Sequence, residues 1–458
     1  MNENRIQQLN DPAPDADGGY VLYWMQQSQR AHANPALEYA IRLANERNQG
    51  VIVGFGLMVD YPEANRRHFA FMLEGLSETV AALHDRGIKC VARKGAPDQV
   101  ALDLAQQASV VVCDRGYLRH QRQWRRHVAA HAAKQVIQVE GDTVVPVGAV
   151  SDKREYAART IRPKIGKLRE AHLQSIRETE PRKSSLPLSI KSDIDLRRPD
   201  AVLQGLSFDD DVGRSDRFIG GTSQARRRLR RFILKHLDGY GDARNDPGSP
   251  QCSELSPYLH FGQISPVEIA LKIMAAKSGT QEDKEAFLEE LIVRRELAVN
   301  FVYFEPDYDT CACLPGWARE TLKTHRDDER PHRYTRAEME NAETHDAAWN
   351  AAMREMRITG YMHNYMRMYW GKKILEWTNT PEYAYATALY LNNKYFIDGR
   401  DPVSYASVAW LFGLHDRPWK ERPVFGKVRY MNQNGLRRKF DIDAYIRRVD
   451  DFGRDAGS

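Results

Sequence analysis

Residues 289–296 bring acidic and basic groups together on a segment that is predicted to be helical. Glu289, Glu290 and Glu296 occur there with Arg294 and Arg295. Side chains three or four positions apart on a helix meet, so a salt-bridged surface explains the pattern. The apolar residues 291–293 beside Glu290 favour a second interpretation, an interior carboxyl whose burial disfavours its charged form. Such a carboxyl can donate a hydrogen bond or a proton, and both interpretations stand.

Hydroxyl groups gather near another predicted helix start. Tyr240 precedes a turn-rich stretch, and Ser253 and Ser256 stand just before Pro257, which suits the first turn of a helix. Serine hydroxyls and the free N–H groups of a first helical turn can bind an anion. Helix capping explains much of the same pattern, so an anion site is one of two interpretations.

A basic strip lies near the C-terminal end of the sequence. Residues 419–439 contain one acidic residue, Glu421, and seven basic residues, which are Lys420, Arg422, Lys427, Arg429, Arg437, Arg438 and Lys439. The net charge of the whole chain, 67 − 62 = +5, is too small to indicate nucleic-acid binding by itself. The strip is either a solvated surface or a site for phosphates.

Three tryptophans fall on two neighbouring predicted helices. Trp370 and Trp377 are seven residues apart, so a helix places them on one face, about 10 Å apart along its axis. Trp349 belongs to the helix before. A tryptophan pair at helical spacing is most often core packing, and the residues alone indicate no more than that.

The first 175 residues are predicted to form an α/β domain. Short β-rich runs at 20–25, 51–57, 88–94, 110–114 and 136–139 alternate with amphipathic stretches at 35–48, 62–86, 97–108 and 118–133. This alternation predicts a Rossmann-like domain with a parallel sheet covered by helices. Gly54 and Gly56 lack the third glycine of a dinucleotide fingerprint, and no P-loop pattern occurs, so nicotinamide or P-loop binding has little support.

The remaining sequence divides into a connection and a helical domain. Residues 176–214 are polar and rich in Pro, Ser and Asp, which predicts an interdomain linker. Residues 215–458 are mainly helical, with helices predicted at 222–237, 266–276, 284–302, 345–360, 365–377, 381–391 and 402–411. The expected fold class is therefore α/β followed by all-α.

Composition and cysteine usage narrow the class of protein. The chain has 458 residues, 42% of them hydrophobic and 28% charged, as in soluble folded proteins. Five cysteines without C-x-x-C spacing indicate neither a disulfide framework nor a zinc module, and we predict no metal site. Because we find neither a membrane-length apolar run nor a signal-peptide pattern, we expect a cytoplasmic protein that does not bind membranes.

Five blocks of the sequence resemble class II cyclobutane pyrimidine dimer photolyases. They follow one another in order over almost the whole chain, and the last two are long and specific. The blocks are residues 153–165, 253–263, 290–296, 361–377 and 392–429, the last including Asp-Gly-Arg-Asp-Pro at 398–402 and His-Asp-Arg-Pro-Trp at 415–419. We therefore identify the chain as a member of the photolyase and cryptochrome family.

The resemblance implies a bound flavin. The C-terminal helical domain would hold FAD, reduced and anionic in the active form, and the N-terminal domain can hold an antenna chromophore of the deazaflavin or folate type. Arg367 and Asp398 would form an ion pair beside the isoalloxazine, and Asn392 would face flavin N5. The residues that would cradle the FAD phosphates and ribitol are Tyr240, Ser253, Glu254, Leu255 and Ser256.

The resemblance also implies contacts with the substrate, a cyclobutane pyrimidine dimer in double-stranded DNA. Glu290, kept protonated by its apolar neighbours, would hydrogen-bond the dimer carbonyl groups. Trp419 and Arg429 would enter the gap that the extruded dimer leaves, because photolyases are among the enzymes that flip nucleotides out of the duplex. Further DNA or lesion contacts would come from Arg244, Asn245, Met368, Trp410 and Lys427.

The implied activity is light-driven DNA repair by a monomer. Trp370, Trp349 and an exposed Trp377 would relay electrons to the flavin. One alternative is a cryptochrome-like photoreceptor, against which Glu290, Arg244 and the basic strip argue. A second alternative is a non-catalytic nucleotide- or DNA-binding protein. The sequence departs from the photolyase pattern at Cys252, at Val293-Arg294, where a tryptophan is common, and at Val403-Ser404.

Overall fold

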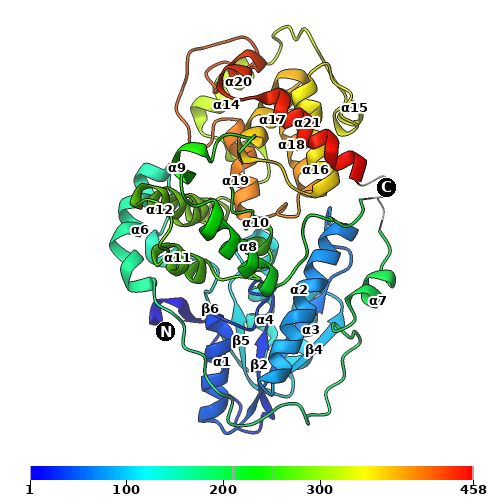
Figure 1. Cartoon of the computed structure of the whole chain (residues 1–458). Helices are drawn as coiled ribbons and strands as arrows, with labels where there is room; N and C mark the ends of the chain where they lie inside the picture. The colour runs from blue at the N-terminus through cyan, green and yellow to red at the C-terminus, as the bar shows by residue number, and fades with distance from the viewer. Residues whose placement is uncertain (1, 209–211, 250, 456–458) are drawn as a thin grey trace.

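The computed structural model describes residues 2–208, 212–249 and 251–455, and its N-terminal part is built on one sheet (Figure 1). The strand order is β1-β6-β5-β2-β3-β4. The strands are β1 (Ile6–Gln8), β2 (Tyr20–Trp24), β3 (Gly50–Leu57), β4 (Lys89–Lys94), β5 (Ala108–Asp114) and β6 (Gln135–Val139). Strands β2 to β6 are parallel, as predicted, whereas the three-residue edge strand β1 runs antiparallel to β6 and is too short to show a period.

Helices cover both faces of this sheet. Val21 and Tyr23 of β2 pack with α1 (Pro35–Glu46) and α2 (Arg66–Asp85). Leu22 and Trp24 point the other way and pack with α3 (Pro97–Ala105) and α4 (Arg119–His131). Since successive side chains of a strand point to opposite faces, a strand buried on both faces must be apolar throughout, as β2 is. The predicted α/β class is confirmed.

One helix begins later than its sequence suggests. The pattern predicts a start at Pro62, but α2 begins at Arg66 because the Asn65 side chain accepts the Arg67 N–H and forms a capping box with His68. The neighbouring helices α1 and α3 do start at their prolines. Side-chain capping at Asn65 therefore sets this boundary.

The predicted linker follows the edge of the sheet. It runs past the foot of the α/β part in Figure 1, and its backbone bonds to β4 and the turn before it. Ser185 N donates to Gly87 O at 3.0 Å, and Asp193 N donates to Ala92 O at 2.9 Å. A short helix, α7 (Pro199–Gln204), lies within it. The domain boundaries at 175 and 214 stay predictions.

The rest of the chain is helical. Its helices are α5 (Val147–Val150), α6 (Ala158–His172), α8 (Thr222–Lys235), α9 (Tyr240–Ala243), α10 (Ser256–His260), α11 (Pro266–Met274), α12 (Gln281–Leu288), α13 (Arg295–Phe304), α14 (Gly316–Thr324), α15 (Arg336–Glu340), α16 (Ala347–Thr359), α17 (Asn364–Trp377), α18 (Pro381–Tyr395), α19 (Pro402–Leu411), α20 (Gln433–Lys439) and α21 (Ile442–Asp455). A short 3-10 turn, Cys311–Cys313, precedes α14. The predicted helix 284–302 is divided by a π-helical segment, Glu289–Arg294 (η2).

Two apolar clusters hold the helices together. Trp349 and Trp370 belong to the cluster of α13, α16–α19 and α21, and both are almost fully buried. Ile161 and Ile165 of α6 pack into the other cluster with Ile292 of η2. Helix α6 therefore contributes to the helical core, although it precedes the linker. Within the described residues, no helix is both long and apolar enough to cross a bilayer.

Candidate functional site

The three glutamates of residues 289–296 lie in different environments. Glu289 is a half-buried ion-pair partner of Arg162, at 2.7 Å, and of Arg294, at 3.3 Å. Glu296 is buried and accepts hydrogen bonds from the backbone N–H groups of residues 144 and 145. Burial raises the pKa of Glu296 to about 8. The salt-bridged interpretation thus holds for Glu289, and the interior one holds for Glu296.

Glu290 lies in η2, between α12 and α13. Short π-helical stretches inside helices are rare and frequently occur at functional sites. Glu290 Oε1 lies 2.9 Å from Arg244 Nη1, and 36% of the Glu290 side chain is exposed. Such an ion pair is made by an ionised carboxylate. The structure therefore differs from the expected interior, protonated carboxyl, because the guanidinium of Arg244, on the C-cap of α9, is within reach.

The hydroxyl-rich segment borders a cavity of about 370 Å³. Ser253 and Cys252 line one side, and Tyr361 and His363 line another. The other lining residues include four arginines, Arg217, Arg228, Arg231 and Arg448. Burial raises the pKa of the Cys252 thiol to about 11, so this residue is neutral beside the arginines. Two carboxylates, Glu254 and Glu355, also line the cavity, so its four arginines leave it with a net positive charge, and the hydroxyls of Ser249 and Ser253 lie at its wall.

The predicted phosphate residues do not all face this cavity. The Glu254 backbone is left-handed, with φ +54°, and its carboxylate pairs with both Arg217 and Arg228. Leu255 is buried in the core, and Ser256 begins α10. A carboxylate repels a phosphate, so the side chains of Glu254 and Leu255 are not phosphate ligands, whereas Ser253 is available.

The donor set of the cavity fits a diphosphate group. Arg217 Nη1 is buried without a hydrogen-bond partner in the described chain and lies 3.7 Å from Glu355 Oε1. Arg231 makes no ion pair with any described residue, and Arg448 Nε lacks a hydrogen bond in the same set. Arginines recognise phosphate oxygens through paired N–H groups. The N–H groups of Arg217 and Arg448 that lack a hydrogen bond within the described residues are therefore a second indication of an anionic ligand.

Arg367 and Asp398 form the ion pair that the sequence analysis expected. Arg367 Nη1 lies 3.1 Å from Asp398 Oδ1, and Arg367 Nη2 lies 3.2 Å from Asp398 Oδ2. The guanidinium also covers the ring of Phe396, 3.9 Å from its centroid. Helix α17 supplies Arg367 and the loop after α18 supplies Asp398. Their place beside a flavin stays a prediction.

Asn392 lies close to this pair, on α18, and its amide is held by neighbours. Its Nδ2 donates to Asn393 Oδ1 at 3.0 Å, and Ser404 Oγ lies 3.4 Å from its Oδ1. Ser404 Oγ also donates to Asp398 O at 2.8 Å. Val403, in contrast, has 39% of its surface exposed. Asn392 and Asp398, which were predicted to lie at the flavin, are therefore connected through Ser404, one of the residues that departs from the photolyase pattern.

The tryptophans are connected in the predicted order. Trp349 Nε1 donates to Trp370 O at 2.9 Å, and the rings of Trp349 and Trp377 are 5.4 Å apart. The expectation that Trp377 is exposed is wrong, since only 2% of its surface is accessible. Tyr334 and the exposed His345 cover it, with ring centroids 5.4 and 5.3 Å from that of Trp377. Tyr334 lies outside the predicted tryptophan helices, so helical spacing did not indicate it, whereas His345 is the first residue of the predicted helix 345–360.

Trp410, Trp419 and Arg429 come together through the loop that follows α19. The Arg429 guanidinium lies 5.6 Å from the Trp410 ring and 4.4 Å from the Trp419 ring. Asp416 accepts a hydrogen bond from Trp419 Nε1 at 3.2 Å and lies 3.5 Å from Arg429 Nε. No role was predicted for Asp416 from the sequence, although it belongs to the 415–419 motif.

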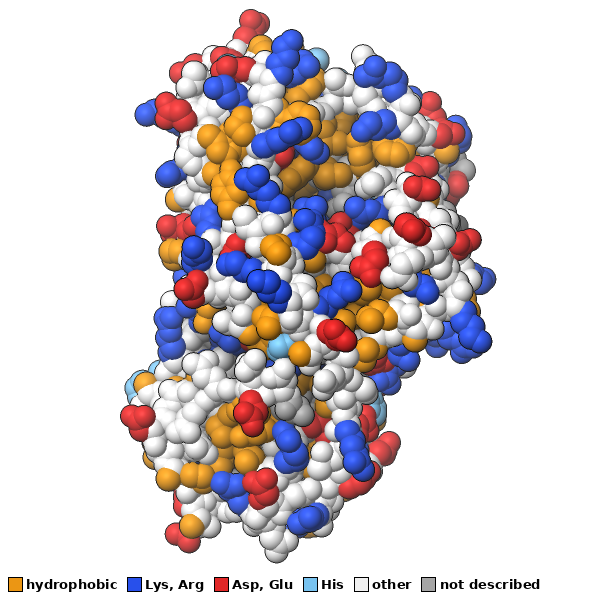
Figure 2. All heavy atoms as spheres, turned by 90° about the vertical axis from the view of Figure 1, so that its left-hand side faces the viewer, with side chains coloured by type: hydrophobic (Ala, Val, Ile, Leu, Met, Phe, Trp, Pro, Cys, Tyr) orange, Lys and Arg blue, Asp and Glu red, His pale blue; other side chains and the backbone are white. Residues whose placement is uncertain are grey.

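Other predicted contact residues lie on the same part of the molecule. Lys427 is exposed on the 419–430 loop, and Asn245 and Met368 are half-buried beside Arg244 and Arg367 in the sequence. Lys372 is fully buried next to Trp410, with its Nζ 5.0 Å from the Trp410 ring. Burial lowers the pKa of Lys372 to about 7. Figure 2 shows Lys and Arg side chains around exposed apolar surface on this helical half of the molecule.

The departures from the photolyase pattern have different consequences. Val293 is buried in the helical core, and the neighbouring Arg294 is exposed and pairs with Glu289. Neither residue presents an aromatic ring.

A second cavity, of about 130 Å³, lies between the sheet and the helical part. It is placed at the carboxyl ends of β2 and β3, next to the point where the strand order reverses between β2 and β5, a common ligand position in such sheets. Asp114 at the end of β5 accepts the N–H groups of Gln26, Gln27 and Ser28, at 3.1, 3.0 and 2.8 Å. Burial raises the pKa of Asp114, and these backbone donors oppose that shift.

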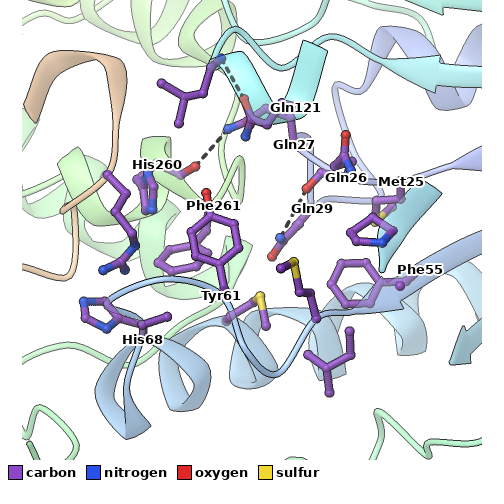
Figure 3. A pocket seen from close by; sticks show the side chains of 18 of the residues that line it. Met25, Gln26, Gln27, Gln29, Phe55, Tyr61, His68, Gln121, His260 and Phe261 are labelled. Atoms are coloured by element: carbon purple, nitrogen blue, oxygen red, sulfur yellow. Dashed lines mark hydrogen bonds between the residues drawn. The ribbon is translucent and has the colours of Figure 1, made fainter. Parts of the chain in front are cut away.

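The walls of the second cavity are apolar and its rim carries amides (Figure 3). Gln121 Nε2 donates to Gln27 Oε1 at 2.8 Å, and Gln27 Nε2 donates to His260 O at 3.1 Å. Both polar atoms of the Gln26 amide, and Oε1 of Gln29, are buried without a hydrogen-bond partner in the described part of the chain. Buried polar groups are normally satisfied, so these amides indicate a ligand. The sequence analysis named none of these residues.

Comparison with known proteins agrees with this arrangement. A family model described as DNA photolyase matches residues 21–183. A deoxyribodipyrimidine photo-lyase of Methanothermobacter thermautotrophicus is 47% identical over 449 residues, which cover 98% of each chain.

Solved structures with little sequence identity share the fold. An archaeal photolyase from Sulfolobus tokodaii, solved with two FAD molecules, has a TM-score of 0.70 at 16% identity and covers 93% of this chain and 89% of its own. A cryptochrome of Synechocystis has a TM-score of 0.74 at 16% identity, covering 93% and 88%.

Proposed function

The chain belongs to the DNA photolyase family, and on this premise we propose that it is a class II photolyase that uses light to split cyclobutane pyrimidine dimers in double-stranded DNA. The observation that carries the proposal is the convergence of the Arg367–Asp398 pair, Asn392 and the arginine-lined cavity with the Glu290–Arg244 pair in one helical domain. When bound there, reduced FAD supplies the electron that opens the cyclobutane ring and takes it back, without net redox change.

The cationic cavity would hold the FAD diphosphate. Its arginines donate to phosphate oxygens, and the Ser253 hydroxyl adds a neutral donor. Arg367 would stabilise negative charge on the flavin ring, and Asp398 fixes the plane of its guanidinium. The Asn392 amide offers both a donor and an acceptor, so it can satisfy a ring nitrogen with or without a proton.

Glu290 would hydrogen-bond the dimer. A carboxyl can donate to a carbonyl oxygen only when it is protonated, so lesion binding has to separate Glu290 from Arg244. Exclusion of water by the lesion favours the neutral carboxyl, and the released guanidinium can pair with a DNA phosphate. One exchange of partners therefore prepares both groups for their roles.

The tryptophans would carry electrons to oxidised flavin when the enzyme is photoreduced. Trp370, Trp349 and Trp377 form a continuous path through the core. Because Trp377 is buried, Tyr334 and His345 provide the contact with solvent. The ring contact between Trp349 and Trp377, and the hydrogen bond from Trp349 to the Trp370 backbone carbonyl, support this order.

The second cavity would hold the antenna chromophore, a deazaflavin or a folate. Its apolar walls suit a flat aromatic ring, and the free amides of Gln26 and Gln29 suit the polar edge of such a ring. Reconstitution with each compound and excitation of its absorption band tests this assignment. Energy transfer to the flavin should raise the repair rate, and replacing Gln26 with Leu should weaken it.

Repair itself is tested by illuminating dimer-containing duplex DNA with chemically reduced, FAD-loaded protein and counting restored pyrimidines. A dark sample and an oxidised sample are the controls. Restoration that depends on both light and reduction supports the proposal. A flavoprotein that binds damaged DNA but restores nothing would contradict it and favour a photoreceptor.

The role of Glu290 is tested in the same assay. Glu290→Ala should keep its FAD and lower the repair yield per photon about tenfold, because a donor to the developing negative charge is lost. Glu289→Ala, one residue away and paired with Arg162 instead of Arg244, is the matched control. Equal yields for both variants would remove Glu290 from the mechanism.

A further inference from the structure

His325 is held between two carboxylates from different parts of the chain. Its Nδ1 lies 2.6 Å from Asp328 Oδ2, and its Nε2 lies 2.9 Å from Glu421 Oε1. The residue is the C-cap of α14, and only 17% of its side chain is exposed. Ionised carboxylates only accept hydrogen bonds, whereas a neutral imidazole has one donor and one acceptor. Both contacts can be made together only when the ring is protonated.

The surroundings favour that protonated form. The hydrogen bonds with Glu421 and Asp328 raise the pKa of His325, and partial burial opposes them weakly. Arg330 acts on Asp328 and Lys427 acts on Glu421, so each carboxylate also has a basic neighbour. Glu329 and Arg422 are the remaining charged residues of the shallow pocket that His325 lines. Since the pKa is raised, the bridge is complete below it and is lost as the pH rises through it.

The bridge fixes a loop against α14. Val424 N donates to Asp328 Oδ2 at 2.8 Å, and Lys427 N donates to Thr321 Oγ1 at 3.0 Å. Gly426 has a left-handed backbone, with φ +52°, and a Cβ there would lie 2.1 Å from Thr321 Oγ1. The loop therefore rests directly on the helix, and a side chain at position 426 would push it away.

The same loop carries the groups that face DNA in the proposed function. Trp419 N donates to Lys427 O at 2.8 Å, so the two ends of the loop are tied together. Arg429 follows, stacked on Trp419. Glu421 is the acid of the basic strip, and His325 neutralises it. Release of Glu421 would place a negative charge among residues that meet phosphates.

We propose that His325 is a positioning residue for DNA binding, whose imidazolium clamps residues 419–430 on α14 and masks Glu421. This inference rests on the proposed function, in which that loop contacts damaged DNA. Damaged duplex should consequently bind more tightly below the His325 transition than above it. This effect on DNA binding does not depend on the repair chemistry at the flavin.

The experiment measures binding in the dark, by fluorescence anisotropy of a duplex with one thymine dimer, from about pH 6 to about pH 9 at constant salt. Wild-type affinity should fall about fivefold as the pH rises. A change of this size is expected when the charge of Glu421 is no longer neutralised and the contact of His325 with the loop is lost. His325→Gln should bind more weakly at low pH and show a flat profile. Glu421→Gln should also be flat and should bind at high pH at least as tightly as wild type. His84→Gln, at an exposed histidine in the last turn of α2, is the matched histidine control and should keep the wild-type profile.

A second measurement needs no DNA. The pKa of His325, followed by NMR in the holoenzyme, should lie above that of an ordinary histidine and fall in Glu421→Gln. An ordinary or lowered pKa would overturn the clamp even if His325→Gln failed to fold.

The DNA contacts of the loop and the clamp by His325 can be tested separately. If Arg429→Ala and Lys427→Ala bind as wild type does, the loop is not a DNA surface and the proposed function of this loop fails. If those variants weaken binding but His325→Gln and wild type share one pH profile, only the clamp is overturned.

Discussion

Asn392 Nδ2 donates to Asn393 Oδ1 at 3.0 Å, and this bond fixes which way the Asn392 amide points. Asn393 Oδ1 also accepts the backbone N–H of Arg400 at 3.1 Å, and Asn393 Nδ2 donates to Glu63 Oε2. A backbone donor on one side and a carboxylate on the other leave Asn393 a single orientation. A residue of the α/β part thereby orients the amide proposed to face the flavin.

Asn393→Asp is therefore expected to destabilise the protein by about 2 kcal/mol, because two carboxylates would then face each other in a buried site. Urea unfolding of the holoenzyme measures this loss, and a changed flavin spectrum would accompany it. Adding Glu63→Gln should restore most of the stability, since an amide can donate where Glu63 cannot. A double variant as unstable as the single one would show that Glu63 does not orient Asn393.

Trp370→Phe should fold, bind FAD and fail to photoreduce oxidised flavin, while repair by chemically reduced protein survives. The repair electron comes from the flavin, so the tryptophan path is needed only to reduce it. Flavin absorbance under blue light, followed by dimer loss after dithionite, tests both halves on one preparation. The substitution should cost about 1–2 kcal/mol of stability, as a buried ring is made smaller.

Tyr334→Phe separates the surface end of this path from its core. Without the phenol, photoreduction should slow but persist, because the three tryptophans remain connected. Tyr383→Phe, at an exposed tyrosine of α18, is the control. Normal photoreduction in Trp370→Phe would show that the three tryptophans and Tyr334 only pack the core and do not carry electrons to the flavin.

Arg429→Ala and Lys427→Ala should each weaken binding to damaged duplex and lower the slope of log affinity against log salt by about one unit. Each variant removes one cation from the loop. Arg197→Ala, at an exposed linker residue paired with Asp195, should leave the slope unchanged. An unchanged slope in the loop variants would identify the strip as a solvated surface.

Stability should depend on pH through Glu296. Burial raises its pKa to about 8, so the folded protein holds a proton that the unfolded chain has released. The free energy of unfolding should therefore fall as the pH rises from about 4.5 to about 8, by at most 1.4 kcal/mol per unit. Glu296→Gln should flatten this dependence in urea titrations at several pH values. A variant whose stability falls as steeply as that of wild type would place the titration elsewhere.

The sequence alone was enough to predict the parallel sheet and most helix positions, because apolar periodicity is a local property. It also determined the family, since the motifs at 398–402 and 415–419 are short and contiguous. Strand β1 was not predicted, because three residues are too few to show a periodic pattern. The start of α2 was placed too early, because its cap depends on one side chain, that of Asn65.

The folded structure shows how residues far apart in the chain meet. It paired Glu290 with Arg244, buried Trp377 beneath Tyr334 and His345, and turned the Glu254 carboxylate toward two arginines. It also brought His325 to Glu421 and Glu63 to Asn393, across elements far apart in the chain. Protonation, exposure and amide orientation depend on partners within a few ångströms, and those partners are set by packing rather than by neighbouring sequence.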